Sequence, residues 1–149
     1  MSKNTTFANG KHMTQPSIIQ KVGGIITKDK RLLVVRKKTA DNRSEFIIPG
    51  GRKEGDESHQ ETLTRELMEE LGVTLRGMRL FGSFDETAVF ENIPLHMDVY
   101  YAEVEGEPTP HSEIKEYMWI DRAYADHGIV LGSVLAKHVV PKLVAEGVL

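Results

Sequence analysis

The chain of 149 residues contains no cysteine. This absence excludes disulfide bonds, zinc sites built on thiolates and a cysteine nucleophile. No apolar run approaches the roughly 20 residues that a membrane-spanning helix needs. The first 20 residues also lack the apolar centre of a signal peptide. We therefore expect a cytoplasmic protein without a membrane partner.

The chain also lacks an excess of basic residues, because 19 lysines and arginines stand against 22 aspartates and glutamates, a formal net charge of −3. Proteins that bind nucleic acid usually show a basic patch, so we expect no nucleic acid polymer as a partner. Hydrophobic residues make up 40% of the chain and charged residues 28%. This balance is sufficient for a buried core.

The N-terminal 16 residues are polar and show no hydrophobic period. We expect a flexible leader there, or added sequence ahead of Met13. No internal repeat or linker divides the remainder, and its length fits one domain. We therefore expect a single domain over residues 17–149.

Short apolar runs between turn residues predict strands in most of this domain. Val22–Thr27 and Leu32–Arg36 are rich in β-branched residues and flank a turn-prone Lys-Asp-Lys, so we expect a hairpin. Similar signals predict further strands in these segments: Phe46–Ile48, Leu80–Phe84, Val89–Phe90, Leu95–Val104 and Met118–Ile120.

Two segments show helical periodicity. Glu57–Leu71 carries leucines at every fourth position and is followed by Gly72, a natural C-terminal stop. The second segment, roughly Val130–Ala145, contains Pro141, which should kink or restart the helix. Strands with one central and one C-terminal helix predict an α/β or α+β sandwich, in which helices cover a mixed sheet.

The first helix also carries three closely spaced acidic residues, Glu66, Glu69 and Glu70. At these spacings the carboxylates share a face, which we place opposite the leucines and expect to face solvent. Like charges so placed destabilise a helix by a few tenths of a kcal/mol per pair, and a divalent cation would reverse that effect. An oxygen-only site suits Mg²⁺ or Mn²⁺ rather than zinc. The alternative is an acidic helix face that is merely solvated.

The residues around these glutamates follow a longer pattern. Gly51, five residues, Glu57, seven residues and then Arg65 to Val73 resemble the Nudix box at every position that the box specifies. A chance match is on the order of 10⁻⁹ per starting point from average residue usage. The order of elements extends the resemblance over roughly residues 17–144. It implies a Nudix-type α/β/α sandwich, with a mixed curved sheet between helices.

The resemblance also implies a cofactor and its ligands. Mg²⁺ is the expected ion, and Mn²⁺ should be able to replace it. The implied ligands are one backbone carbonyl and three carboxylates: Gly51, Glu66, Glu69 and Glu70. We assign the handling of the attacking water to Glu66, Glu69 and a loop carboxylate, Glu113. Glu116 is the alternative loop residue, and both loop residues could equally be surface charges.

Other side chains receive supporting roles. We expect Glu57 and Arg65 to pair and so to hold the loop against the helix, and Gly72 to have a structural role in the motif. Arg36, at the end of a predicted strand, is the candidate for substrate phosphate, with a salt bridge to a surface acid as the alternative. His96 and Asp98 share a strand face, where they either line a base pocket or are ordinary surface residues. Three more histidines are expected at the surface, and one tryptophan in the core: His59, His111, His138 and Trp119.

The motif implies hydrolysis of a phosphoanhydride bond in a small nucleotide. The compact single domain most resembles the group that acts on nucleoside triphosphates, which implies a triphosphate that gives a monophosphate and pyrophosphate. ADP-ribose, nucleotide sugars and dinucleoside polyphosphates remain alternatives. Val89 stands where ADP-ribose hydrolases often have proline, and Phe90 stands where diadenosine polyphosphate hydrolases have tyrosine. A nucleotide-binding regulator without catalysis is an alternative of another class, although such domains usually lose box glutamates. The oligomeric state is undetermined, with a homodimer left open.

Overall fold

The computed structural model describes residues 5–8, 11–14, 18–38, 45–88 and 93–149. In the N-terminal segment, β1 (Thr5–Ala8) and β2 (Lys11–Thr14) form an antiparallel hairpin, where the sequence suggested no regular element. The strand expected at residues 89–90 lies outside the described residues.

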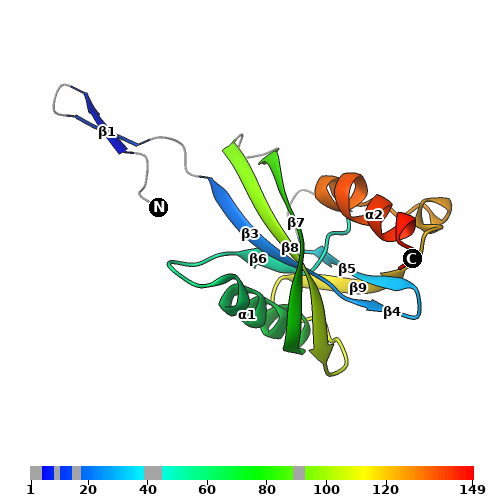
Figure 1. Ribbon diagram of the computed structural model, residues 1–149. Helices are drawn as coiled ribbons and strands as arrows, with labels where there is room; N and C mark the ends of the chain where they lie inside the picture. The colour runs from blue at the N-terminus through cyan, green and yellow to red at the C-terminus, as the bar shows by residue number, and fades with distance from the viewer. Residues whose placement is uncertain (1–4, 9–10, 15–17, 39–44, 89–92) are drawn as a thin grey trace.

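Four strands form a mixed sheet in the order β6-β3-β8-β7. Their bounds are Ile19–Ile25 for β3, Gly50–Arg52 for β6, Thr74–Ala88 for β7 and Ile93–Glu105 for β8. Strands β3 and β8 run parallel, and the other neighbours are antiparallel. The pairing of β7 with β8 shifts register before Gly77 and again before Gly82. Such bulges bend a strand, and the long β7–β8 pair is visibly curved and twisted (Figure 1).

The remaining three strands form a second sheet in the order β4-β5-β9, with the bounds Thr27–Lys28, Arg31–Lys37 and Ile114–Ile120. Asp29 and Lys30 have φ values of 52° and 60°, as the type I′ turn of a two-residue hairpin requires. The predicted hairpin is therefore correct at its tip. It is wrong for β3, because β6 and β8 occupy both edges of that strand.

Helix α1 (His59–Leu71) begins two residues later than the sequence suggested. Ser58 and Glu61 form a capping box, which satisfies backbone N–H groups at the first turn. At the other end, Gly72 adopts a left-handed conformation with φ 67°, and its N–H donates to the carbonyl of Met68. The glycine thus ends the helix as predicted.

The C-terminal helical segment is interrupted close to Pro141. The short 3₁₀ helix η1 (Tyr124–His127) precedes a π-helical turn, η2 (Leu135–Val139), which leads into α2 (Val140–Ala145). In this turn the N–H of Val140 donates to the carbonyl of Leu135. Proline has no N–H to donate within a helix, so the wider turn is the disturbance expected beside Pro141.

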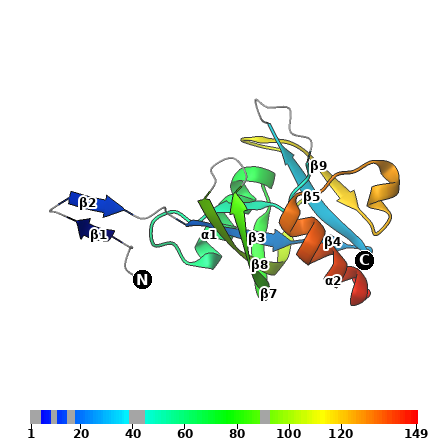
Figure 2. The ribbon, with the colours of Figure 1, turned by 90° about the horizontal axis from the view of Figure 1, so that it is seen from above.

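Two apolar cores lie on opposite sides of the strands. In β5, Leu33 and Val35 pack in the core under α1, whereas Leu32 and Val34 pack in the core under η2 and α2. Alternate side chains of a strand point to opposite faces, so a single strand supplies both cores. Figure 1 and Figure 2 show α1 and α2 on opposite sides of the strands. The predicted sandwich with a mixed curved sheet is confirmed.

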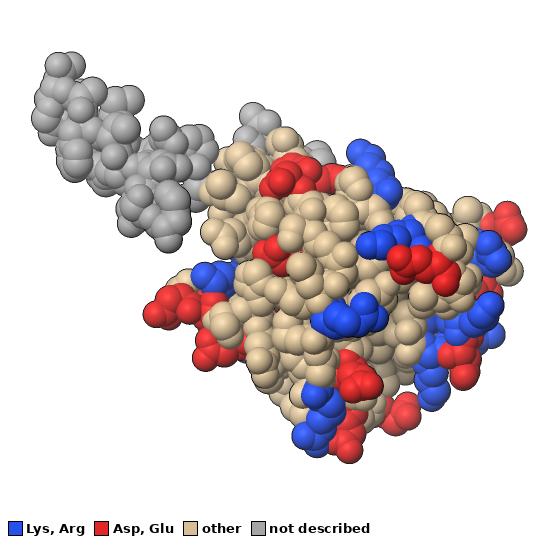
Figure 3. All heavy atoms as spheres, viewed as in Figure 1, with Lys and Arg blue, Asp and Glu red and all other residues tan. Residues whose placement is uncertain are grey.

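Among the described residues, no helix has the length and apolar character that crossing a membrane requires. On the face shown in Figure 3, the described basic and acidic side chains are interspersed, and neither sign forms a continuous patch.

Candidate metal and active site

Two consecutive glycines bring strand β6 into close contact with its neighbours. A Cβ atom on Gly51 would lie 2.4 Å from the carboxyl carbon of Glu66. A Cβ on Gly50 would lie 2.1 Å from the carbonyl oxygen of Val22, and its φ of 144° also favours glycine. The Glu66 carboxylate therefore lies directly against the Gly51 backbone, in space that a side chain would fill.

Glu70 is buried beside this contact and is only 1% exposed. The N–H of Gly50 donates to Glu70 Oε1 at 3.1 Å, whereas Oε2 has no hydrogen-bond partner. Burial raises the pKa of Glu70 to about 8; Lys37 and the Gly50 hydrogen bond act in the opposite direction, and Glu66 adds to the rise. The predicted solvent-facing ridge is therefore wrong for Glu70. This side of α1 faces β6 rather than water.

The other two glutamates contact Arg65. Its Nη1 lies 2.9 Å from Glu66 Oε2 and 3.3 Å from Glu69 Oε1. In the described part of the chain, no group of three histidine, aspartate or glutamate side chains is arranged to hold a metal ion. Glu69, whose side chain is 53% exposed, would have to turn away from Arg65 to join such a site.

The residues nevertheless fit a hard divalent cation. Glu70 presents an oxygen without a hydrogen bond, and Glu66 lies against the backbone of Gly51. The donors are all oxygens, the ligand type that Mg²⁺ and Mn²⁺ prefer. Glu66 and Glu70 lie one helical turn apart and are largely removed from water, so their negative charges repel each other. A cation that binds both carboxylates would reduce this repulsion.

Arg65 and Glu57 form the pair that the sequence predicts. Nε and Nη2 of Arg65 donate to the two Glu57 oxygens at 2.8 and 3.0 Å. Nη2 also donates to the Arg52 carbonyl at 3.0 Å, which ties the end of β6 to α1. The Arg65 hydrogen bonds lower the pKa of Glu57 to about 2, and Glu57 in turn raises the pKa of Arg65.

We expect Glu57→Gln to lower the midpoint of thermal unfolding, because it removes the charge from a bidentate pair. A carboxyl whose pKa is lowered on folding stabilises the protein above its unfolded pKa, and that contribution is lost as the pH falls through its folded pKa. The gap between wild type and variant should thus be full above about pH 5 and shrink between pH 4.5 and about 2. Thermal melts in EDTA across this range measure it. Glu54→Gln is the control, because Glu54 is exposed and lies 3.6 Å from Arg65; an equal effect of both variants would contradict the assignment.

Glu113 reaches the same region through Lys37. The Lys37 ammonium lies 3.1 Å from Glu113 Oε1 and 3.9 Å from Glu70 Oε2. The loop that carries Glu113 is attached to the end of α1, where the N–H groups of Thr109 and His111 donate to the carbonyls of Leu71 and Glu70. These bonds satisfy carbonyls that a helix end leaves free. The backbone of this loop is therefore held on the end of α1.

Lys37 is the site residue that sequence reasoning missed. It follows Leu33 and Val35 in the period of β5 and so belongs to the face that packs under α1. Arg36 belongs to the opposite face, where it lies over the Phe46 ring at 5.1 Å and forms a salt bridge with Glu116. A salt bridge was the alternative to phosphate binding for Arg36. Its partner, Glu116, was the alternative to Glu113 as the loop carboxylate.

His96 and Asp98 belong to a polar cluster. Asp98 is buried and accepts from Ser83 Oγ at 2.5 Å; it also lies 3.2 Å from His96 Nε2 and 3.4 Å from His59 Nε2. The second nitrogen of His96 faces Asp85 at 2.8 Å, and this contact raises the pKa of His96. The cluster joins the start of α1 to the sheet.

The histidines expected at the surface fall into two groups. His59 and His138 are half-buried: the first contacts the Tyr100 hydroxyl, and the second stacks on Phe84 with centroids 4.7 Å apart. Their side chains are still 36% and 37% exposed, so both lie at the surface, with partners from neighbouring strands that the sequence does not place together. His111 is exposed, and Trp119 packs against the core under α1.

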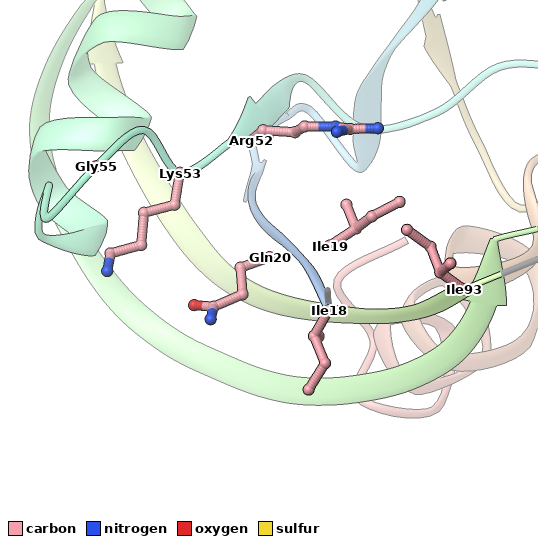
Figure 4. A pocket seen from close by; sticks show the side chains of 7 residues that line it. All are labelled: Ile18, Ile19, Gln20, Arg52, Lys53, Gly55 and Ile93. Carbon is pink, nitrogen blue, oxygen red and sulfur yellow. The ribbon is translucent and has the colours of Figure 1, made fainter. Parts of the chain in front are cut away.

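A hollow of about 250 Å³ lies where β3 and β6 meet. Figure 4 shows three isoleucines and a glutamine beside the basic residues that follow Gly51. Its lining residues are Ile18, Ile19, Gln20, Arg52, Lys53, Gly55 and Ile93. One lining residue, Arg52, directly follows Gly51, against which the Glu66 carboxylate lies.

A mixed sheet whose glycine pair lies against a glutamate-bearing helix is the arrangement that the Nudix resemblance implies. The family model described as NUDIX domain matches residues 19–136. The chain therefore belongs to the NUDIX domain family, the family of Nudix hydrolases that its motif predicts.

The chain is similar to known proteins in sequence and, for solved structures, in fold. The ADP-ribose pyrophosphatase of Methanocaldococcus jannaschii is 35% identical over 63 residues, which are 42% of this chain and only 37% of that protein. The MutT NUDIX hydrolase of Burkholderia pseudomallei is 25% identical, with a TM-score of 0.64 over 70% of this chain and 83% of that chain. A NUDIX hydrolase from Nitrosomonas europaea is 17% identical, with a TM-score of 0.73 over 88% and 90% of the two chains. The last likeness shows the fold alone.

Proposed function

We propose that this chain hydrolyses a phosphoanhydride bond in a nucleoside diphosphate joined to another group, with Mg²⁺ as cofactor. The observation that carries the proposal is the acidic pair at β6: Glu70 is buried with one oxygen lacking a hydrogen bond, and Glu66 lies against Gly51. A buried carboxylate is costly unless a proton or a cation neutralises it. A site that binds a cation together with a pyrophosphate accounts for this cost.

The proposed ligands are the Gly51 carbonyl and the carboxylates of Glu66, Glu69 and Glu70. The ion would lower the pKa of a water molecule and stabilise charge on the attacking and leaving oxygens. Mn²⁺ should replace Mg²⁺, since both ions accept oxygen-only sites. Glu57 and Arg65 hold the loop before α1 in place, and Gly72 ends the helix.

Glu113 is proposed to orient the attacking water, together with Glu66 and Glu69. Its side chain is 58% exposed and so is accessible to a substrate, while Lys37 keeps it near Glu70. Arg36 is paired with Glu116 through Nη2, so a phosphate would compete with that carboxylate for the guanidinium.

A nucleoside triphosphate that gives a monophosphate and pyrophosphate is the proposed substrate. The hollow beside Arg52 has a volume of about 250 Å³, below the roughly 300–1,000 Å³ typical of pockets that enclose drug-sized ligands. A larger ligand would extend beyond it. ADP-ribose is the second candidate, because the Methanocaldococcus relative is named for its hydrolysis. A small-molecule substrate and a cytoplasmic location, with one domain over residues 17–149, belong to the same proposal.

Activity should require about millimolar Mg²⁺ or micromolar Mn²⁺, because oxygen-only sites hold these ions weakly until phosphates join them. Product release measured over a metal titration, with and without EDTA, tests this expectation. Turnover at full rate in excess EDTA would rule out the metal site.

A panel of nucleoside triphosphates, ADP-ribose, nucleotide sugars and dinucleoside polyphosphates identifies the substrate. A triphosphate should give a monophosphate and pyrophosphate, and reaction in ¹⁸O-labelled water locates the phosphorus that is attacked. A diphosphate with inorganic phosphate would contradict the proposed bond. Metal-dependent nucleotide binding without any product would support the non-catalytic alternative.

A further inference from the structure

Lys37 is the cation that faces the buried carboxylate. Its ammonium lies 3.9 Å from Glu70 Oε2, the oxygen without a hydrogen bond, and 3.1 Å from Glu113 Oε1. The side chain is 27% exposed, whereas that of Glu70 is 2% exposed. Lys37 thus opposes the rise in the pKa of Glu70 without forming a hydrogen bond to it.

These distances describe a counter-ion that is held loosely. A separation of 3.9 Å exceeds the 2.7–3.2 Å of an N–H···O hydrogen bond. The closer partner, Glu113, is 58% exposed, and ion pairs in contact with water are weak. Little free energy is therefore needed to move the ammonium away from Glu70.

We propose that Lys37 is the internal counter-ion of the metal-free site and that a divalent cation displaces it. This inference rests on the proposed function, because it concerns the same metal site. An ammonium and a divalent cation beside the same carboxylates repel each other. Lys37 therefore weakens metal binding in the absence of substrate, and its displacement leaves an ammonium at the edge of the site.

Lys37→Met should therefore bind the metal ion more tightly than wild type, because the variant lacks the ammonium that repels the ion. At a pH above about 8, where the Glu70 carboxyl of wild type is ionised, we expect the Mn²⁺ dissociation constant, without substrate, to fall about tenfold, which is a modest effect for one unit charge at this distance. Electron paramagnetic resonance of free Mn²⁺ or calorimetry measures it without turnover. Lys37→Arg keeps the charge and should bind Mn²⁺ as wild type does.

Lys38→Met is the matched control. Lys38 is the next residue, and its ammonium contacts the Ser112 carbonyl at 3.3 Å. Its removal should leave the Mn²⁺ dissociation constant unchanged. Thermal melts confirm that each variant is folded, and Lys37→Gln replaces Lys37→Met if the methionine variant is not.

The outcomes separate the two proposals. If wild type binds no Mn²⁺, or Glu66→Gln binds it equally well, the metal site is wrong, and the role of Lys37 is wrong with it. If Glu66→Gln weakens binding but neutral replacements of Lys37 leave it unchanged or weaken it, only the counter-ion role is overturned. If Lys38→Met tightens Mn²⁺ binding as much as Lys37→Met does, the cause is the general charge of the surface, and the counter-ion role of Lys37 is also overturned.

Discussion

Glu66→Gln should lower kcat about 10²-fold or more while the protein remains folded. Loss of one preorganised charge stabiliser in an active site commonly costs ~3 kcal/mol of transition-state stabilisation. Glu66 fits this role because its carboxylate lies against Gly51 and is only 12% exposed. Initial rates at saturating substrate and metal, divided by the folded fraction, measure the loss.

The same substitution at Glu61 is the control for this prediction. Glu61 lies on the same helix and is exposed, and its contact is with the backbone N–H of Ser58 in the capping box. Glutamine can replace glutamate in a capping box, so Glu61→Gln should keep its activity. If Glu66→Gln keeps its activity as well, the acidic side of α1 is structural. If only its metal requirement rises, the carboxylate binds the ion without further catalytic effect.

Glu70→Gln should stabilise the metal-free protein at high pH and reduce a pH dependence that wild type shows. Burial raises the pKa of this carboxyl from 4.5 to about 8. A raised carboxyl pKa means that the folded state holds a proton that the unfolded state releases. Stability is therefore lost as the pH rises from about 4.5 through about 8. At 1.36 kcal/mol per pH unit the loss is up to about 5 kcal/mol.

Denaturant unfolding in EDTA between pH 5 and 9 tests this sign. Wild type should weaken as the pH rises to about 8, and Glu70→Gln should weaken less because its amide cannot ionise. The raised pKa of His96 contributes the same loss to both proteins. Glu69→Gln is the control: its side chain is 53% exposed, so this variant should follow wild type. Wild-type stability that rises with pH would show that Glu70 is ionised in the metal-free fold. Saturating Mn²⁺ should remove most of the wild-type loss, because a bound cation stabilises the ionised carboxylate.

Both predictions follow from one packing relationship. Helix α1 places Glu66 and Glu70 one turn apart, and the glycine pair of β6 brings the backbone against them. Glu66 contacts the backbone of Gly51 and retains some exposure to solvent, whereas Glu70 is buried. The same substitution is thus expected to affect turnover at one position and pH-dependent stability at the other.

Local signals in the sequence determined the helix, its end and the motif. Leucines at four-residue spacing pack on one side of α1 because a helix returns to the same face every 3.6 residues, and all three are fully buried. The pair of Arg65 with Glu57 and the left-handed Gly72 follow from residues within one short segment. The alternation of side chains along β5 also determines that Lys37 points to the same face as Leu33 and Val35. The predicted strand ended one residue too early to include it.

Only the tertiary structure decided which segments meet. Strand β3 lies between β6 and β8, although the sequence suggested a local hairpin, because strand pairing depends on partners far along the chain. Glu70 is buried because the backbone of Gly50 lies over it, and Lys37 meets Glu113 because the loop before β9 docks on the end of α1. The pKa of a carboxyl depends on the water and charges around it. The periodicity of one helix identifies the glutamates, but only the packed neighbours determine which of them is enclosed and which cation it faces.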